Sequence, residues 1–171
     1  MDLTETLEKD LARIIGFIGN CDSKTSIILG ATLTAVSLIL GLCGNEIAKD
    51  ITGSEIGITI TISAVLLGSV AIVIMGITNI LNSIRARLNP SEYKDDSSVI
   101  FYGKIAPLTL EQYREKVLTR DESSYITDLT AQIHTCSIIC QTKFGYYNKG
   151  LKYSVIGTGL LIVTAVLSLL V

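Results

Sequence analysis

Three long stretches of this chain contain no charged residue, and they constrain its fold more than any other feature. They are Thr25–Asn45, Ile56–Ile84 and Tyr153–Val171. A helix needs about 20 mainly apolar residues to cross the hydrocarbon core of a bilayer, and each stretch is long enough. Soluble cores seldom contain helices with such runs. The pattern therefore predicts an all-α integral membrane protein with three transmembrane helices.

The basic residues orient these predicted spans. Only Lys49 among the 14 Lys and Arg lies in the segment 46–55 between the first two spans. The others lie before the first span or between the second and the third. Since cytoplasmic loops carry the excess of Lys and Arg, residues 1–24 and 85–152 are predicted to be cytoplasmic. The segment 46–55 is then an external loop, and the C-terminus is external as well.

Apolar residues at helical spacing continue two spans into the predicted cytoplasmic part. They are Leu3, Leu7, Leu11, Ile14 and Ile18 before the first span, and Ile126, Leu129, Ile133, Cys136, Cys140, Phe144, Tyr147 and Leu151 before the third. Spacings of three and four place such residues on one helix face. We expect an amphipathic helix over 1–24 and a long helix over about 120–152. Packing within the chain and a homo-oligomeric seam both fit these stripes.

The segment between the second and third spans has a different sequence pattern, with short elements in place of long apolar runs. The apolar run Val99–Gly103 fits either a short strand or a packed loop. Thr109-Leu-Glu-Gln and Thr119-Arg-Asp-Glu both have the form of a helix capping box. These boxes predict a short helix over Leu110–Leu118 and a second helix that begins at about Arg120. The acidic residues among the first 24 do not fit a cleavable signal peptide, so the first span is expected to be retained.

Small residues line the predicted spans. Gly30 and Gly41 share a face of the first span, Gly68 and Gly76 belong to the second, and Gly157 to the third. Small faces let helix backbones approach closely in lipid. Contacts within one chain and contacts between protomers both fit. No span has a charge at its centre, which argues against a proton relay or a pump.

The chain shows no constellation typical of catalysis or metal binding. His134 is the only histidine, and it lies about 200° around a helix from Cys136, so the two are not expected to hold one ion. No glycine pattern of a phosphate-binding loop occurs. The net charge of −2 gives no electrostatic case for binding nucleic acid. We therefore expect a protein that is not an enzyme and holds no metal or resident cofactor.

A polar motif, Asn20-Cys-Asp22-Ser-Lys24, stands where the first span begins. Asp22 and Lys24 are two residues apart and point to different sides of a helix, so each needs a partner elsewhere. In one interpretation Lys24 anchors the helix at the membrane interface, and Asp22 is solvated or paired with Arg85 or Arg87. In the other, the motif couples a cytoplasmic pocket to the bundle of spans.

The order of these motifs resembles the Pycsar effector transmembrane family of bacterial antiphage defence, and the likeness covers nearly the whole chain. The matching segments are Asn20-Cys-Asp22-Ser-Lys24, Arg85 and Arg87, Phe101-Tyr102-Gly103-Lys104-Ile105-Ala106, Asp128-Leu129-Thr130-Ala131-Gln132-Ile133, and Lys143-Phe144. Through this resemblance Gln132 joins Asn20, Asp22 and Lys24 in the expected coupling motif.

The resemblance implies an effector of the bacterial inner membrane that responds to a cyclic pyrimidine mononucleotide, cCMP or cUMP, made by a partner cyclase. The cytoplasmic part would bind this ligand. The spans, rearranged in the lipid or assembled as a homo-oligomer, would then impair the membrane and stop the growth of the infected cell. A ligand-independent, holin-like pore and a passive membrane scaffold are the alternatives.

A cyclic nucleotide needs hydrogen-bond donors for its phosphate and an aromatic or apolar surface for its base. The cationic candidates are Arg85, Arg87, Lys104, Arg114 and Lys143. The aromatic candidates are Tyr102, Tyr113 and Tyr125. The basic residues also satisfy the positive-inside pattern, and a single Tyr is often a packing residue, so each candidate has an ordinary structural role as well.

Overall fold

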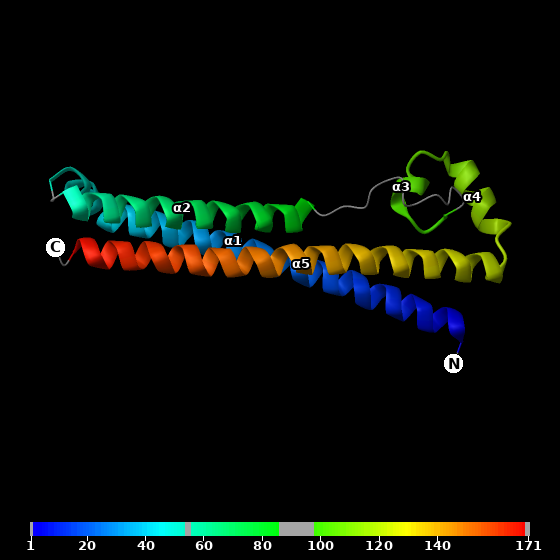
Figure 1. The fold of residues 1–171 in the computed structure, drawn as a ribbon. Helices are drawn as coiled ribbons and strands as arrows, with labels where there is room; N and C mark the ends of the chain where they lie inside the picture. Colours follow the sequence, from blue (N-terminus) through cyan, green and yellow to red (C-terminus); the bar gives the residue numbers. More distant parts are fainter. Residues whose placement is uncertain (1, 54–55, 86–97, 170–171) are drawn as a thin grey trace. The chain divides into compact units, whose positions relative to one another are not determined.

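The computed structural model describes residues 2–53, 56–85 and 98–169, and these residues are helical apart from short connecting segments (Figure 1). The helices in this part of the chain are α1 (Leu3–Gly53), α2 (Ile56–Arg85), α3 (Tyr102–Ile105), α4 (Leu110–Leu118) and α5 (Glu122–Ser168). No strand occurs among the described residues, so the all-α prediction is confirmed. The run that begins at Val99 is a bend followed by α3, which makes the strand alternative wrong.

Three of the helices are long and apolar enough to cross a membrane. The segments concerned are Leu3–Asn45 of α1, Ile60–Arg85 of α2 and Glu122–Ser168 of α5. The prediction of three span-forming helices is therefore confirmed by length and composition. The side of the membrane on which each end lies stays a prediction.

The chain forms two compact units. One contains residues 1–20 and 86–142, and we call it the polar unit. The other contains residues 21–85 and 143–171, and we call it the three-helix unit because α1, α2 and α5 contribute to it. The boundaries between the units fall inside α1 and α5, so each of these two helices belongs to both units.

The predicted apolar stripes lie on the buried sides of their helices. Leu7 and Ile14 of the first stripe are half-buried, whereas Leu3 at its beginning is 58% exposed. In the second stripe Leu129 is fully buried and Ile133 is half-buried. This burial agrees with packing of the stripes within the chain.

The segment predicted as an external loop, residues 46–55, is helical up to Gly53, so the loop assignment is wrong for that part. The sequence explains the extension, because Ala48 and Lys49 are strong helix formers. Thr52 also donates its hydroxyl to the carbonyl oxygen of Ala48, at 3.0 Å, which is compatible with a helix. Residues 54–55 lie outside the described part of the chain.

The beginning of α4 confirms one predicted capping box. The Thr109 hydroxyl oxygen accepts a hydrogen bond from the Gln112 backbone N–H at 3.3 Å. The Gln112 side-chain oxygen accepts one from the Thr109 N–H at 2.9 Å. Both bonds satisfy donors that have no partner within the helix. The bounds of α4 are those predicted.

The second predicted capping box is wrong. Thr119 ends α4 instead, and its hydroxyl donates to the carbonyl oxygen of Glu115 at 2.8 Å. Asp121 caps α5, where its carboxylate accepts from the Ser124 N–H at 3.0 Å. Hydrogen bonds from the side chain and backbone of Ser124 hold the pKa of Asp121 below its ordinary value. The stabilisation by this cap is therefore lost as the pH falls through that lowered pKa.

The backbones of α2 and α5 approach each other closely at glycine residues of the three-helix unit. A Cβ atom placed on Gly157 would stand 2.8 Å from the backbone nitrogen of Val73. One placed on Gly76 would stand 2.7 Å from the backbone nitrogen of Ser154. Real Cβ atoms do not come so near, so packing within one chain accounts for these two glycines. Figure 1 shows α2 beside the C-terminal half of α5.

Three other glycines of the spans lie on open faces of their helices. A Cβ atom at Gly30, Gly41 or Gly68 would have open space around it. Large apolar side chains on α1, α2 and α5 are also exposed: Ile27 (70%), Leu42 (79%), Leu67 (70%) and Val155 (64%). Such surfaces are compatible with lipid, which is as apolar as these side chains.

Gly157→Ala is expected to lower the thermal unfolding midpoint of the detergent-solubilised protein. The new methyl group would force α2 and α5 apart, and overpacking of this kind destabilises by about 1–3 kcal/mol. Gly68→Ala is the matched control, since open space surrounds that residue on α2. It is expected to leave the midpoint unchanged or slightly raised. Equal midpoints for the two variants would contradict the close α2–α5 contact.

Candidate functional site

A buried polar cluster joins α1, α2 and α5 within the three-helix unit, and we call it the interhelical cluster. Its centre is the ammonium group of Lys143 on α5. This group lies 2.6 Å from a carboxylate oxygen of Asp22 on α1. It also donates to the carbonyl oxygens of Ser83 at 3.1 Å and Ile84 at 3.3 Å on α2. An ammonium group has three N–H donors, so these partners use all of them.

The position of Ser83 and Ile84 explains why a cation is stabilised there. Both residues lie in the last turn of α2, where carbonyl groups have no partner within the helix. The partial negative charge at a helix C-terminus also favours a cation. The Ser83 hydroxyl returns a hydrogen bond to the carbonyl oxygen of Lys143 at 3.0 Å. The side chain and backbone of Lys143 are therefore both attached to the end of α2.

The α1 side of the interhelical cluster is polar as well. The Thr25 and Ser83 hydroxyl oxygens are 3.4 Å apart, and both residues are fully buried. Thr25 also donates to the carbonyl oxygen of Cys21 at 2.7 Å. The Cys21 sulfur lies 4.0 Å from the Ser83 hydroxyl oxygen. Ser83 thus contacts both of the other helices.

The Asp22–Lys143 ion pair is asymmetric. The side chain of Lys143 is 8% exposed, whereas that of Asp22 is 45% exposed. Loss of Asp22 would leave a buried cation with only carbonyl partners, and an uncompensated buried charge is strongly destabilising. Loss of Lys143 would leave a carboxylate that water still reaches. Removal of the Asp22 carboxylate is therefore expected to destabilise the three-helix unit more than removal of the Lys143 ammonium group.

The residue that pairs with Asp22 in the interhelical cluster is Lys143. Arg85, which the sequence suggested as a partner, is exposed. Arg87 lies outside the described residues. Lys143, which the sequence suggested as a phosphate donor, has its three N–H groups directed to protein oxygens. In this arrangement Lys143 connects helices.

The remaining residues of the expected coupling motif are divided between the units. Asn20 is exposed and is the last residue of α1 that belongs to the polar unit. Lys24 is exposed in the three-helix unit. Gln132 is buried in the polar unit, with 4% of its surface exposed. Their role in coupling stays a prediction.

A second polar feature is a cavity of about 340 Å³ in the polar unit, at the beginning of α5. The described residues of its lining are Val99, Lys116, Thr119, Arg120, Ser123, Ser124, Thr127 and Asp128. These residues supply two cationic side chains, four hydroxyl groups and one carboxylate. Groups of this kind bind phosphate and sugar oxygens through charge-assisted and neutral hydrogen bonds.

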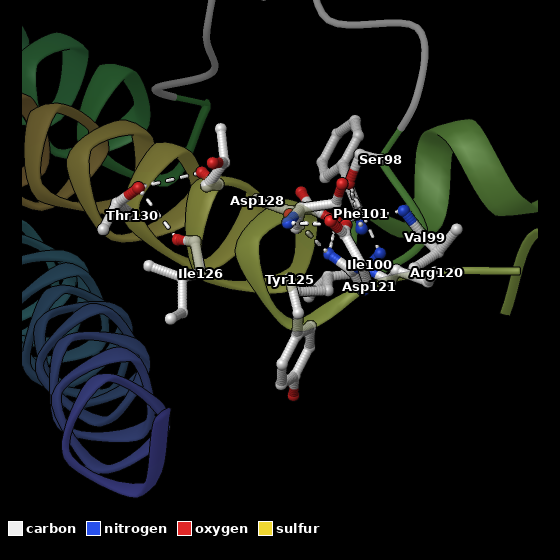
Figure 2. Close-up of polar contacts among 12 residues, drawn as sticks. Ser98, Val99, Ile100, Phe101, Arg120, Asp121, Tyr125, Ile126, Asp128 and Thr130 are labelled. Carbon is white, nitrogen blue, oxygen red and sulfur yellow. Dashed lines mark hydrogen bonds and ion pairs between the residues drawn. The ribbon is translucent and has the colours of Figure 1, made fainter. Parts of the chain in front are cut away.

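An ion pair fixes the geometry at one side of this cavity. A guanidinium nitrogen of Arg120, Nη2, donates to Asp128 Oδ2 at 2.9 Å, and the Val99 backbone N–H donates to the same oxygen at 3.0 Å. Arg120 Nη2 also donates to the carbonyl oxygen of Ser124 at 3.2 Å. Figure 2 shows Arg120 and Asp128 beside the backbone segment that contains Val99 and Phe101. The side chains of the pair are 14% and 6% exposed.

The other carboxylate oxygen of Asp128, Oδ1, is buried and has no hydrogen-bond partner among the described residues. Buried polar atoms are nearly always paired in folded proteins, so an exception requires an explanation. The oxygen belongs to a side chain that lines the cavity.

Tyr125 holds the other side of Arg120. The Arg120 guanidinium carbon lies 4.4 Å from the centre of the Tyr125 ring, in a cation–π arrangement. The Tyr125 hydroxyl donates to a Glu8 carboxylate oxygen at 2.7 Å, which joins α1 to α5 in the polar unit. This bond raises the pKa of Tyr125, so its stabilising effect is complete below the ordinary pKa of tyrosine and is lost at higher pH.

The ligand candidates that the structure describes do not line this cavity. Arg85, Tyr102 and Arg114 are exposed, and Lys104 and Tyr113 are half-buried. Tyr125, the remaining aromatic candidate, has one ring face covered by Arg120.

Sequence reasoning missed the residues that do line the cavity. The run from Thr119 to Ser124 could have indicated them, because Arg120 lies there among residues that carry hydroxyl groups. The capping-box pattern at Thr119 drew attention to helix initiation alone. Within the described residues, no three His, Cys, Asp or Glu side chains gather as metal ligands.

A double-mutant cycle of Asp22→Asn and Lys143→Met is expected to give a coupling free energy of about 1–2 kcal/mol, because the two groups are in direct contact and Lys143 is buried. The measurement is the free energy of unfolding in detergent. The Glu5–Lys9 pair, also 2.6 Å apart but 55% and 66% exposed, is the matched control. It is expected to give about 0.3–0.5 kcal/mol. Equal coupling in both cycles would show that Lys143 does not hold the helices together.

Comparison with known proteins identifies a family and a relative of this chain. The family described as "Pycsar effector protein domain" matches residues 6–171. The chain is 25% identical over 175 residues to the Pycsar effector protein GmPycTM of Gulbenkiania mobilis, which covers 92% of this chain and 88% of that relative. No solved structure matches the chain. The chain therefore belongs to the Pycsar effector transmembrane family of antiphage defence.

Proposed function

We propose that the protein binds a cyclic pyrimidine mononucleotide, cCMP or cUMP, in its polar unit and then impairs the inner membrane through its three-helix unit. The infected cell would stop growing before the phage matures. The observation that carries this proposal is the combination, in one chain, of a cation-lined cavity and three long apolar helices. Membership of an effector family supports it.

The cavity suits a ligand of this size and charge. Pockets for small molecules have volumes of roughly 300–1,000 Å³, and the cavity of about 340 Å³ lies at the lower end of that range. Lys116 and Arg120 bring positive charge to its lining. A cyclic mononucleotide is small and carries one negative charge, and a partner cyclase would supply it.

The helices provide a physical route from ligand to membrane. Both α1 and α5 belong to the polar unit and to the three-helix unit. A ligand changes the state of a protein when it binds one arrangement better than another. Shifts of packed helices are a common form of such a change.

In the active state, the open faces at Gly30 and Gly41 would allow a second copy of α1 to approach closely in lipid, so we propose a homo-oligomer. The excess of Lys and Arg in residues 1–24 and 85–152 supports a cytoplasmic polar unit.

The purified protein in detergent is expected to bind cCMP or cUMP in calorimetry, and to bind cAMP and cGMP more weakly. Reconstituted in liposomes loaded with a self-quenching dye, it should release the dye when the binding nucleotide is added, because ligand binding would change the helix arrangement. Protein-free liposomes with the same nucleotide are the control.

Three other outcomes would contradict parts of this proposal. Dye release that is constitutive and indifferent to nucleotides would indicate a holin-like pore. Nucleotide binding without any release would separate sensing from membrane damage. A protein that neither binds a cyclic nucleotide nor permeabilises liposomes would be a scaffold.

A further inference from the structure

We infer that the cavity at the beginning of α5 is the ligand site, that Lys116 and Arg120 face the ligand phosphate, and that Asp128 Oδ1 accepts a hydrogen bond from a ligand N–H or O–H group. This inference rests on the proposed function and names the residues of that site. The sequence patterns did not suggest this site, since none of the described cationic candidates, Arg85, Lys104, Arg114 and Lys143, lines the cavity.

The unpaired oxygen of Asp128 carries the argument. The side chain is 6% exposed, and its Oδ2 atom receives two hydrogen bonds, from Arg120 and from the Val99 backbone. Its Oδ1 atom receives none from the described residues. The ion pair with Arg120 keeps the carboxylate in place, so this unpaired acceptor is held within a side chain that lines the cavity.

The fixed guanidinium group of Arg120 is the second part of the site. Asp128, Ser124 and the ring of Tyr125 hold it from several sides. The hydrogen bonds of Arg120 to Ser124 and Asp128 both use the same nitrogen, Nη2, whereas a guanidinium group has five N–H donors. A group held in this way needs little reorganisation when an anion binds.

The charged groups of the lining suit an anionic ligand. Its described part contains two cationic side chains, Lys116 and Arg120, and one carboxylate, that of Asp128. A cyclic phosphodiester is an anion, and cationic side chains favour such a ligand through charge complementarity.

The hydroxyl groups of the lining fit the sugar of a nucleotide. The Thr127 hydroxyl donates to the carbonyl oxygen of Ser123 at 2.9 Å, and the Thr119 hydroxyl donates to that of Glu115 at 2.8 Å. Each hydroxyl oxygen can still accept a hydrogen bond. The donor for Asp128 would be the ribose 2′-hydroxyl, the amino group of cytosine or the ring N–H of uracil.

Asp128→Asn tests this assignment directly, by calorimetry of the full-length protein in detergent with cCMP and cUMP. The amide keeps the shape of the carboxyl group, so it can preserve the contacts of Oδ2 while placing an NH₂ group where Oδ1 was. A donor would then meet a donor, and the affinity is expected to fall at least about tenfold. Lys116→Met is expected to weaken binding by a similar factor, because it removes one phosphate-facing charge.

The matched controls are Asp10→Asn and Lys9→Met, which make the same chemical changes at exposed ion pairs on α1 in the polar unit. They are expected to leave the affinity unchanged. Unfolding midpoints of all variants show whether each is folded. If Asp128→Asn does not fold, the affinity of Lys116→Met for the nucleotide decides whether the inference holds.

Failure of the inference and failure of the proposed function give different results. If the unmodified protein binds a cyclic nucleotide and both cavity variants bind it equally well, the ligand site lies elsewhere and the inference is overturned, while the proposed function stands. If the unmodified protein binds no cyclic nucleotide, the proposed function fails and the inference fails with it.

Discussion

The three-helix unit depends on the polar contacts of one buried group, the ammonium group of Lys143. Apolar side chains gain little by packing on each other in lipid, because the lipid is equally apolar. A directed polar contact therefore contributes more to one defined arrangement. Lys143 supplies it by binding a carboxylate of α1 and two terminal carbonyl groups of α2 at once. The glycine contacts between α2 and α5 then bring the two backbones together further along the same helices.

Features determined by local sequence were predictable. The charge-free stretches predicted the three apolar helices, and Thr109-Leu-Glu-Gln predicted where α4 begins. Errors arose where two local patterns competed. Thr119 fits the beginning of one helix and the end of another, and the structure uses it for the second. The segment before Gly53 contains strong helix formers, but its charges and its place between two spans suggested a loop.

The polar clusters were less predictable because their residues are far apart in the sequence. Asp22 and Lys143 are separated by 121 positions, and no pattern near Asp22 identifies its partner. The cavity combines Val99, the end of α4 and the first turns of α5. The sequence shows that each of these residues is polar or small, but only the tertiary structure brings them together. The same tertiary structure explains why Lys143, a reasonable phosphate donor by sequence, is engaged with other helices.

The continuity of α5 has a mechanical consequence. The helix runs without a break from the cavity residues near Glu122 to Lys143 and beyond. A flexible joint would dissipate a displacement, whereas a stiff rod conveys it as sliding or as torsion about its own axis. The ammonium group of the interhelical cluster is attached to that helix through the four-carbon side chain of Lys143. A rotation of α5 beyond the reach of this side chain would break the ion pair and both carbonyl contacts together, because one ammonium group makes all three.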